Sequence, residues 1–142
     1  MVDKLLIATH NKGKFHEIVE VLGDLPLKIF SLDDLNIPED VEEAGTTHEQ
    51  NAILKAHYFF KKRGMPTLAE DSGIYVDAFP GQLGVQTRRW KGLGATSDEE
   101  WIAHFLKAME AVADSDRTAR FVCHAALILD DNSFARPFLF NG

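Results

Sequence analysis

A short apolar segment that leads through a polar turn into an amphipathic helix pattern constrains the fold most. Residues 5–8 are apolar and residues 9–11 are polar, and the next apolar residues recur at the i, i+3, i+4, i+7 spacing of one helix face. These residues are Phe15, Ile18, Val19 and Leu22. The pattern predicts a buried strand, a tight turn and a helix that ends at Gly23, a typical unit of α/β proteins.

Further strands are expected on both sides of an acidic loop. Residues 27–30 predict a second strand, and residues 33–43 form the acidic loop. Residues 67–69 and 74–76 predict two short strands that a glycine turn at Gly73 separates.

Two further helices are expected from their caps. Thr46 or Thr47 is a candidate N-cap for a helix that runs to about Lys62 and ends at Gly64, and Ser97 is a candidate N-cap for another. The inward-facing residues expected of the first helix are Ile53, Ala56 and Phe60. Those expected of the second are Ile102, Phe105, Leu106 and Met109.

The remaining segments complete an alternation of strands and helices. Residues 80–96 are rich in glycine and are expected to form a mobile loop. Residues 119–129 predict a long central strand, which a turn at residues 130–132 connects to another strand around residues 134–140. The order of elements predicts an α/β fold within one domain, because 142 residues suffice for one compact core.

Composition excludes several classes of function. Lys and Arg number 15 against 22 Asp and Glu, for a net charge of −7, which disfavours binding to a nucleic-acid backbone. The longest apolar stretches, such as residues 125–129, are far shorter than the roughly 20 residues of a membrane-spanning helix. The start of the chain lacks the features of a signal peptide, and the single Cys123 permits no internal disulfide. We therefore expect a soluble cytoplasmic protein.

The polar turn at residues 9–14 is a candidate phosphate site. It lies between a predicted strand and the first turn of a helix, where free backbone N–H groups favour an anion. Thr9 and Asn11 can donate hydrogen bonds, and Lys12 and Lys14 add positive charge. The alternative is that Asn11 only caps the helix and that the lysines are solvated.

Carboxylates are the second candidate group. Glu70 and Asp71 follow an apolar strand, so they emerge at a sheet end and point to opposite faces, and Glu43 can add a third carboxylate from the acidic loop. Such hard oxygen ligands suit Mg²⁺. The alternative is a hydrated acidic turn.

Cationic side chains are the third group. Asn51 and Lys55 lie four residues apart on a predicted helix face distinct from the apolar one, and Lys55 can bind phosphate oxygens or be ordinary solvated surface. Arg88 and Arg89 can clamp an anion or be plain surface arginines. The six histidines show no HExxH or other zinc-binding spacing.

Five segments taken in order resemble one family, the non-canonical purine nucleoside triphosphate pyrophosphatases, or inosine/xanthosine triphosphatases. They are residues 9–14 (THNKGK), 42–46 (EEAGT), 49–56 (EQNAILKA), 69–73 (AEDSG) and 117–121 (RTARF). The resemblance implies an elongated two-lobed mixed β-sheet flanked by helices, with a central groove, and a homodimer. It also implies Mg²⁺-dependent cleavage of nucleoside triphosphates between the α- and β-phosphates, which yields the monophosphate and pyrophosphate.

The resemblance also assigns roles by position. The triphosphate would be bound in the first turn, and Glu43 would be a metal ligand. Lys55 would contact phosphate, and Asp71 would bind metal or activate water, with Glu70 beside it. The remaining substrate-binding positions are Thr9, Asn11 and Lys14 in the first turn, Ser72 and Gly73 after the carboxylates, and Arg89 in the glycine-rich loop.

Several positions depart from the family's pattern. His10 stands where the family commonly has Gly, so it can crowd the phosphate turn or donate a hydrogen bond to it, and Glu70 replaces the commoner Asp. Residues 86–88 replace the usual aromatic-Ser-Ala. The family's later base-reading segments are absent, so we expect residues 1–142 to be one domain that lacks the C-terminal part of the fold. A nucleotide-binding but catalytically weak partial protein, or a pyrophosphatase for other modified nucleotides, are the alternative functions.

Overall fold

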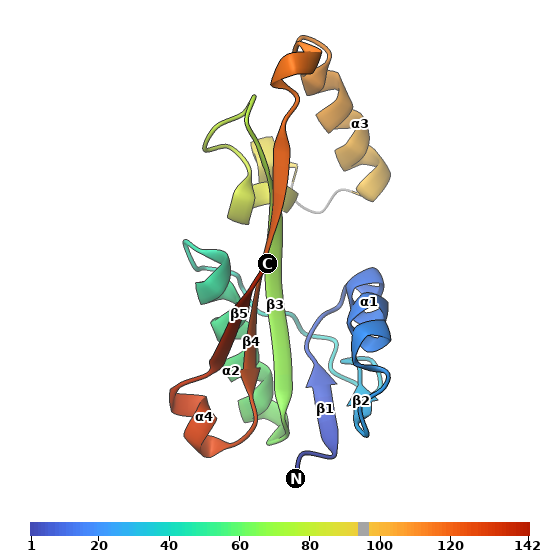
Figure 1. Cartoon of the computed structure of the whole chain (residues 1–142), viewed down its shortest axis with the longest axis vertical. Helices are drawn as coiled ribbons and strands as arrows, with labels where there is room; N and C mark the ends of the chain where they lie inside the picture. Colours follow the sequence, from blue (N-terminus) through green and yellow to red (C-terminus); the bar gives the residue numbers. More distant parts are fainter. Residues whose placement is uncertain (94–96) are drawn as a thin grey trace. The chain divides into compact units, whose positions relative to one another are not determined.

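A computed structural model describes residues 1–93 and 97–142. Five strands form a single sheet: β1 (Lys4–Ile7), β2 (Lys28–Phe30), β3 (Thr67–Val76), β4 (Ala119–Ile128) and β5 (Phe138–Asn141). The helices are α1 (Lys12–Leu22), α2 (His48–Arg63), α3 (Asp98–Met109) and α4 (Asp131–Ala135), with 3₁₀ helices η1 (Gly84–Gly92) and η2 (Asp114–Asp116). Figure 1 shows these elements along the chain, which confirms the predicted α/β fold.

The sheet is mixed, with strand order β2-β1-β3-β4-β5. β1 is parallel to both of its neighbours, and β4 is antiparallel to β5. In the β1–β3 ladder Leu6 pairs with Thr67 and Ile7 with Leu68. This register brings the polar turn after β1 level with Glu70, because both chains continue in the same direction.

The chain divides into two compact units. The first consists of Met1–Asp71 and His124–Gly142. Its core joins the sheet to α2, with Leu6, Phe59 and Ile128 almost completely buried. The apolar face of α1 is only half-buried, because none of its residues reaches full burial. The helix α2 is therefore the better anchored of the two that flank this part of the sheet.

The second unit is Ser72–Cys123, and aromatic packing forms its core. Trp90 is 2% exposed and lies among Phe79, Trp101 and Phe105, with ring centroids 5.2 to 6.3 Å away. Trp101 and Phe105 stack at 5.2 Å. Within the described residues, no helix is long and apolar enough to cross a membrane.

The helix starts follow the predicted caps. Asn11 accepts a hydrogen bond from the backbone of Lys14, and Thr47 accepts one from the backbone of Gln50. Ser97 and Glu100 form a complete capping box at the start of α3. At the end of α2, Gly64 takes the left-handed conformation at φ 60°, which suits glycine.

Three predictions about strands and loops are wrong. β3 is one continuous strand of ten residues, without a turn at Gly73. The short helix α4 replaces the simple turn before β5, because Asp130 and Ser133 cap each other. Within residues 80–96, η1 is a helical segment with a kink at Trp90 and Lys91, and residues 94–96 lie outside the described part of the chain.

The expected inward face of α3 is also partly wrong. Ile102 and Leu106 are exposed, whereas Trp101, Phe105 and Met109 pack in the second unit's core. The indole of Trp101 donates a hydrogen bond to the carbonyl of Thr87 at 2.7 Å. This aromatic anchor turns the helix so that its 101-105-109 row, rather than its 102-106 row, faces inward.

Gly73 permits a close approach of two backbone segments instead of a turn. A Cβ atom there would lie 2.2 Å from the carbonyl oxygen of Gly84 and 2.8 Å from Oγ1 of Thr87. We expect Gly73→Ala to lower the free energy of unfolding by about 1–3 kcal/mol, because a backbone carbonyl cannot easily move away. Chemical denaturation measures this effect. Gly23→Ala is the matched control, since Gly23 has a φ of −60° and a Cβ there would lie 3.3 Å from the nearest backbone oxygen, so its effect should be smaller. Equal effects of both substitutions would refute the interpretation.

Candidate active site

The turn between β1 and α1 is held by its own side chains. Oγ1 of Thr9 accepts a hydrogen bond from the N–H of Asn11 at 3.1 Å, and Oδ1 of Asn11 accepts one from the N–H of Lys14 at 3.0 Å. The capping interpretation of Asn11 is therefore confirmed. The imidazole of His10 turns to the acidic loop, where its Nε2 lies 2.9 Å from the carbonyl oxygen of Glu39. Phosphate binding by this turn stays a prediction.

Glu70 connects this turn to β3. Its carboxylate is buried and forms an ion pair with Nζ of Lys14 at 2.8 Å. Lys14 comes from the first turn of α1, so the ion pair joins the first helix to the strand. A lysine ammonium and a carboxylate thus lie together at the carboxyl end of β1, the end of a parallel sheet where ligands usually bind.

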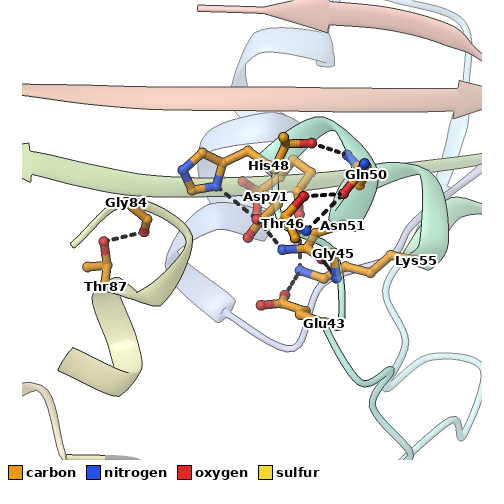
Figure 2. Close-up of polar contacts among 12 residues, drawn as sticks. Glu43, Gly45, Thr46, His48, Gln50, Asn51, Lys55, Asp71, Gly84 and Thr87 are labelled. Atoms are coloured by element: carbon orange, nitrogen blue, oxygen red, sulfur yellow. Dashed lines mark hydrogen bonds and ion pairs between the residues drawn. The ribbon is translucent and has the colours of Figure 1, made fainter. Parts of the chain in front are cut away.

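Asp71 is buried against α2 instead. It is 6% exposed, and its Oδ2 lies 2.8 Å from Nδ1 of His48 and accepts a hydrogen bond from Nδ2 of Asn51 at 3.1 Å. Figure 2 shows both contacts. Glu70 and Asp71 therefore contact different helices, as the alternation of side chains along a strand predicts.

Lys55 lies between the acidic loop and β3. Its Nζ forms an ion pair with the carboxylate of Glu43 and donates a hydrogen bond to the carbonyl oxygen of Glu70 at 3.1 Å. The side chain is only 13% exposed. Burial alone would lower the pKa of Lys55, but its hydrogen bond to Glu43 and the charges of Glu43, Asp71 and Glu70 outweigh burial and raise it. One ammonium group is thus stabilised by three carboxylates.

A glycine fixes the loop that carries Glu43. The N–H of Gly45 donates to Oδ1 of Asn51 at 2.8 Å, and a Cβ at Gly45 would lie 2.5 Å from that oxygen. The side chain of Asn51 is therefore committed at both ends, because its Oδ1 accepts from Gly45 and its Nδ2 donates to Asp71. This single buried amide connects the Glu43 loop, α2 and β3.

The raised pKa of Lys55 predicts a pH dependence of stability. Below the ordinary lysine pKa of 10.5 the group is protonated in both folded and unfolded chains, so its stabilising contribution is complete. As pH rises further the unfolded chain loses this proton first, and the contribution disappears through the folded pKa. We expect the melting temperature to fall more between pH 10 and pH 12 in the unsubstituted chain than in Lys55→Met. An equal fall of the melting temperature in both chains would contradict the pairing of Lys55 with the carboxylates.

Three predicted residues belong to the second unit. Ser72 and Gly73 continue β3, and Arg89 lies exposed on η1. Arg88 forms an ion pair with Asp98 at 2.6 Å, so it is engaged within that unit. The participation of Ser72, Gly73 and Arg89 in substrate binding stays a prediction.

Sequence reasoning assigned no role to His48 and did not predict the burial of Asn51. His48 is 3% exposed, and Asn51 is completely buried. A signal was present, because His48, Asn51 and Lys55 follow the i, i+3, i+7 spacing of one helix face. A polar row of this kind on a helix that packs against a sheet indicates an internal polar cluster. A search limited to zinc-binding spacings cannot detect it.

The donor set fits Mg²⁺ in chemical type. Among residues 1–93 and 97–142, no cluster of three or more His, Cys, Asp and Glu side chains is arranged to hold a metal ion. Mg²⁺ needs only one or two carboxylates when phosphate oxygens and waters complete its shell. Glu43 and Asp71 supply such oxygens. The positive charge beside these carboxylates is now that of the Lys55 ammonium group.

The fold and these residues define an α/β protein with a cluster of carboxylates and lysines beside the carboxyl end of β1. The prediction that Glu70 and Asp71 emerge at a strand end is wrong, because both lie within the continuous strand β3. Residues 5–142 match the Ham1 family, and the chain belongs to that family. This membership confirms the resemblance drawn from the five sequence segments.

Relatives and solved structures agree with this assignment. The chain is 44% identical over 124 residues to a dITP/XTP pyrophosphatase of Geobacter sulfurreducens, and the match covers 87% of this chain and 62% of the relative. It is 40% identical over 139 residues to the Coxiella burnetii dITP/XTP pyrophosphatase, and this match covers 98% of this chain and 68% of the relative. The chain therefore spans roughly two thirds of the length of these relatives.

The fold matches solved Ham1 structures closely. A HAM1 protein from Coxiella burnetii superposes with a TM-score of 0.80 at 37% identity, covering 100% of this chain and 70% of that one. The Staphylococcus aureus Ham1 protein gives a TM-score of 0.75 at 31% identity, covering 99% and 69%. The mixed sheet flanked by helices is thus the fold of this family.

Proposed function

We propose that this chain hydrolyses purine nucleoside triphosphates with abnormal bases, such as ITP, dITP and XTP, to the monophosphate and pyrophosphate. The observation that carries the proposal is the position of Lys55, whose partly buried ammonium group lies against Glu43 and the Glu70 carbonyl and in the field of Asp71. A site of this kind combines cations for phosphate oxygens with carboxylates for a divalent metal. The printed names of the Geobacter and Coxiella relatives, dITP/XTP pyrophosphatase, support the same activity.

The reaction breaks the anhydride bond between the α- and β-phosphates and adds water across it. In the proposal Lys14 and Lys55 bind phosphate oxygens, with Thr9, Asn11 and the N–H groups at the start of α1 beside them. Glu43 and Asp71 would hold Mg²⁺, which when bound offsets the negative charge of the phosphates. Asp71 would also accept a proton from the attacking water, with Glu70 fixing Lys14 nearby.

Nucleotide binding without efficient turnover is the second candidate function. The chain matches 62% of the Geobacter relative and 68% of the Coxiella relative, so the activity of the whole relatives is a proposal for this chain. A homodimer in the cytoplasm belongs to the first proposal, and light scattering of the purified chain tests the oligomer.

A substrate panel separates the candidates. We expect Mg²⁺-dependent release of pyrophosphate from dITP and XTP, with kcat/KM at least about tenfold higher than for dATP. Excess EDTA should abolish release, and added Mg²⁺ should restore it. Preference for a modified pyrimidine triphosphate would indicate the other pyrophosphatase activity. Calorimetric binding of dITP without pyrophosphate release would instead favour the binding protein.

A further inference from the structure

His48 is a buried histidine in direct contact with the proposed catalytic carboxylate. It is the first residue of α2, directly after the N-cap Thr47, so its backbone is fixed by the start of the helix. Its Nδ1 lies 2.8 Å from Oδ2 of Asp71, and the ring is 3% exposed. Because an ionised carboxylate only accepts hydrogen bonds, Nδ1 must carry the hydrogen and donate it to Asp71.

The contacts to Asp71 use one of its two oxygens. Both Nδ1 of His48 and Nδ2 of Asn51 approach Oδ2, and neither of these contacts uses Oδ1. Two donors on one helix therefore hold Oδ2, and Oδ1 takes part in neither of these two contacts. A carboxylate held in this way presents one oxygen in a defined direction to a metal ion or a water molecule.

The orientation of the imidazole is itself restrained. The rings of His48 and His124 lie nearly parallel, with centroids 6.3 Å apart and an interplanar angle of 13°. His124 lies on β4, so the imidazole is held between a helix start and a strand. The neighbouring ring of His124 and the hydrogen bond from Nδ1 to Asp71 together define the orientation of the imidazole.

We propose that His48 is a positioning residue that acts through Asp71. It orients the carboxylate by donating from Nδ1, so that Oδ1 is available for the metal ion and water of the reaction. The inference rests on the proposed function, because it assigns His48 a part in the same site. The competing explanation is that His48 only fills space between α2 and β4.

Three substitutions distinguish the two explanations. His48→Phe keeps an aromatic ring of similar size but removes the donor. His48→Asn places an amide nitrogen the same number of bonds from Cα as Nδ1, whereas His48→Gln moves the donor one bond further out. If His48 only fills space, the His48→Phe variant should retain the most activity. If His48 positions Asp71, the His48→Asn variant should retain the most activity.

Steady-state kinetics with dITP and Mg²⁺ give the first readout. We expect His48→Phe to lower kcat by about 10–100-fold with KM changed less than about threefold, the range typical of residues that orient a metal ligand. His48→Asn should recover most of the lost kcat, and His48→Gln should recover less. Thermal unfolding of each variant shows whether the fold is retained. Equal kcat in the Phe and Asn variants would overturn the proposal.

Calorimetric titration with Mn²⁺ gives a second readout that needs no turnover. We expect affinity to fall about tenfold or more in His48→Phe and to recover in His48→Asn. The same order of affinities in a chain without turnover would refute the proposed function and support the role of His48. Turnover with identical kinetics and Mn²⁺ affinities in all variants would support the proposed function and refute the role of His48. Absence of both turnover and Mn²⁺ binding in the unsubstituted chain would refute both.

Discussion

Asp71→Asn is expected to lower kcat for dITP by about three orders of magnitude, because a positioned general base contributes roughly 10²–10⁴-fold to rate. Asn matches Asp in size, and its Oδ1 can accept the hydrogen bonds from His48 and Asn51 that now reach Oδ2. It carries no negative charge, so it is a poor metal ligand and a poor base. Pyrophosphate release measures the loss, and circular dichroism should show an intact fold.

An exposed carboxylate provides the matched control for Asp71. Asp131 lies in the first turn of α4 and is exposed, so Asp131→Asn makes the same chemical change outside the cluster. We expect it to retain near-normal kcat. A folded Asp71→Asn variant with the activity of Asp131→Asn would remove Asp71 from the mechanism.

Lys55→Met should have the second largest effect, with kcat/KM lowered about 10²–10³-fold, a loss similar to that of removing one group that stabilises developing charge. Met nearly matches the length of Lys but has no charge, so the carboxylates of Glu43, Glu70 and Asp71 lose their shared cation. The same change should lower the free energy of unfolding by about 1–2 kcal/mol. This estimate is below the 3–5 kcal/mol of a fully buried pair because Glu43 is partly exposed.

Two comparisons make the Lys55 result specific. Lys61→Met removes an exposed ammonium from the same helix and should leave kcat/KM unchanged. Lys55→Met and Glu43→Gln should also be non-additive, because the two residues form one ion pair. Additive losses from these two substitutions, or a similar loss in Lys61→Met, would contradict the role of Lys55.

Local features of the fold were predictable from the sequence. Asn11, Thr47 and Ser97 each cap the helix that immediately follows, through hydrogen bonds that span three residues. A cap of this kind depends on neighbouring residues only, so pattern and residue type suffice to identify it. The alternation of strands and helices follows from the same short-range patterns.

Features that depend on distant residues were not predictable in the same way. The continuity of β3 at Gly73 follows from packing against Gly84, eleven positions later in the chain. The face that α3 buries follows from the contact of Trp101 with Thr87. The glycine at position 73 suggested a turn and the apolar spacing in α3 suggested the wrong inward face, and in both cases a tertiary contact determined the structure instead.

In the candidate site, too, the residue types were predictable from local sequence, whereas the contacts between distant residues were not. Glu43, Lys55, Glu70 and Asp71 were identifiable because their residue types and the family-like segments indicated the chemistry. The partners Lys14–Glu70 and His48–Asp71 join residues from different elements, so only the three-dimensional arrangement reveals them. His48 in particular follows no metal-binding spacing in the sequence.

The most direct test of the account is paramagnetic broadening of backbone amide signals by Mn²⁺ in the presence of a dITP analogue with a methylene bridge between its α- and β-phosphates. If the cluster binds one metal–triphosphate complex, the first signals to broaden should come from residues 9–14 and from Glu43, Lys55, Glu70 and Asp71. Signals around Asp77 and Asp116, which line an acidic hollow in the second unit, should stay sharp. Broadening confined to that hollow, or absent from the carboxylate and lysine cluster, would contradict the account.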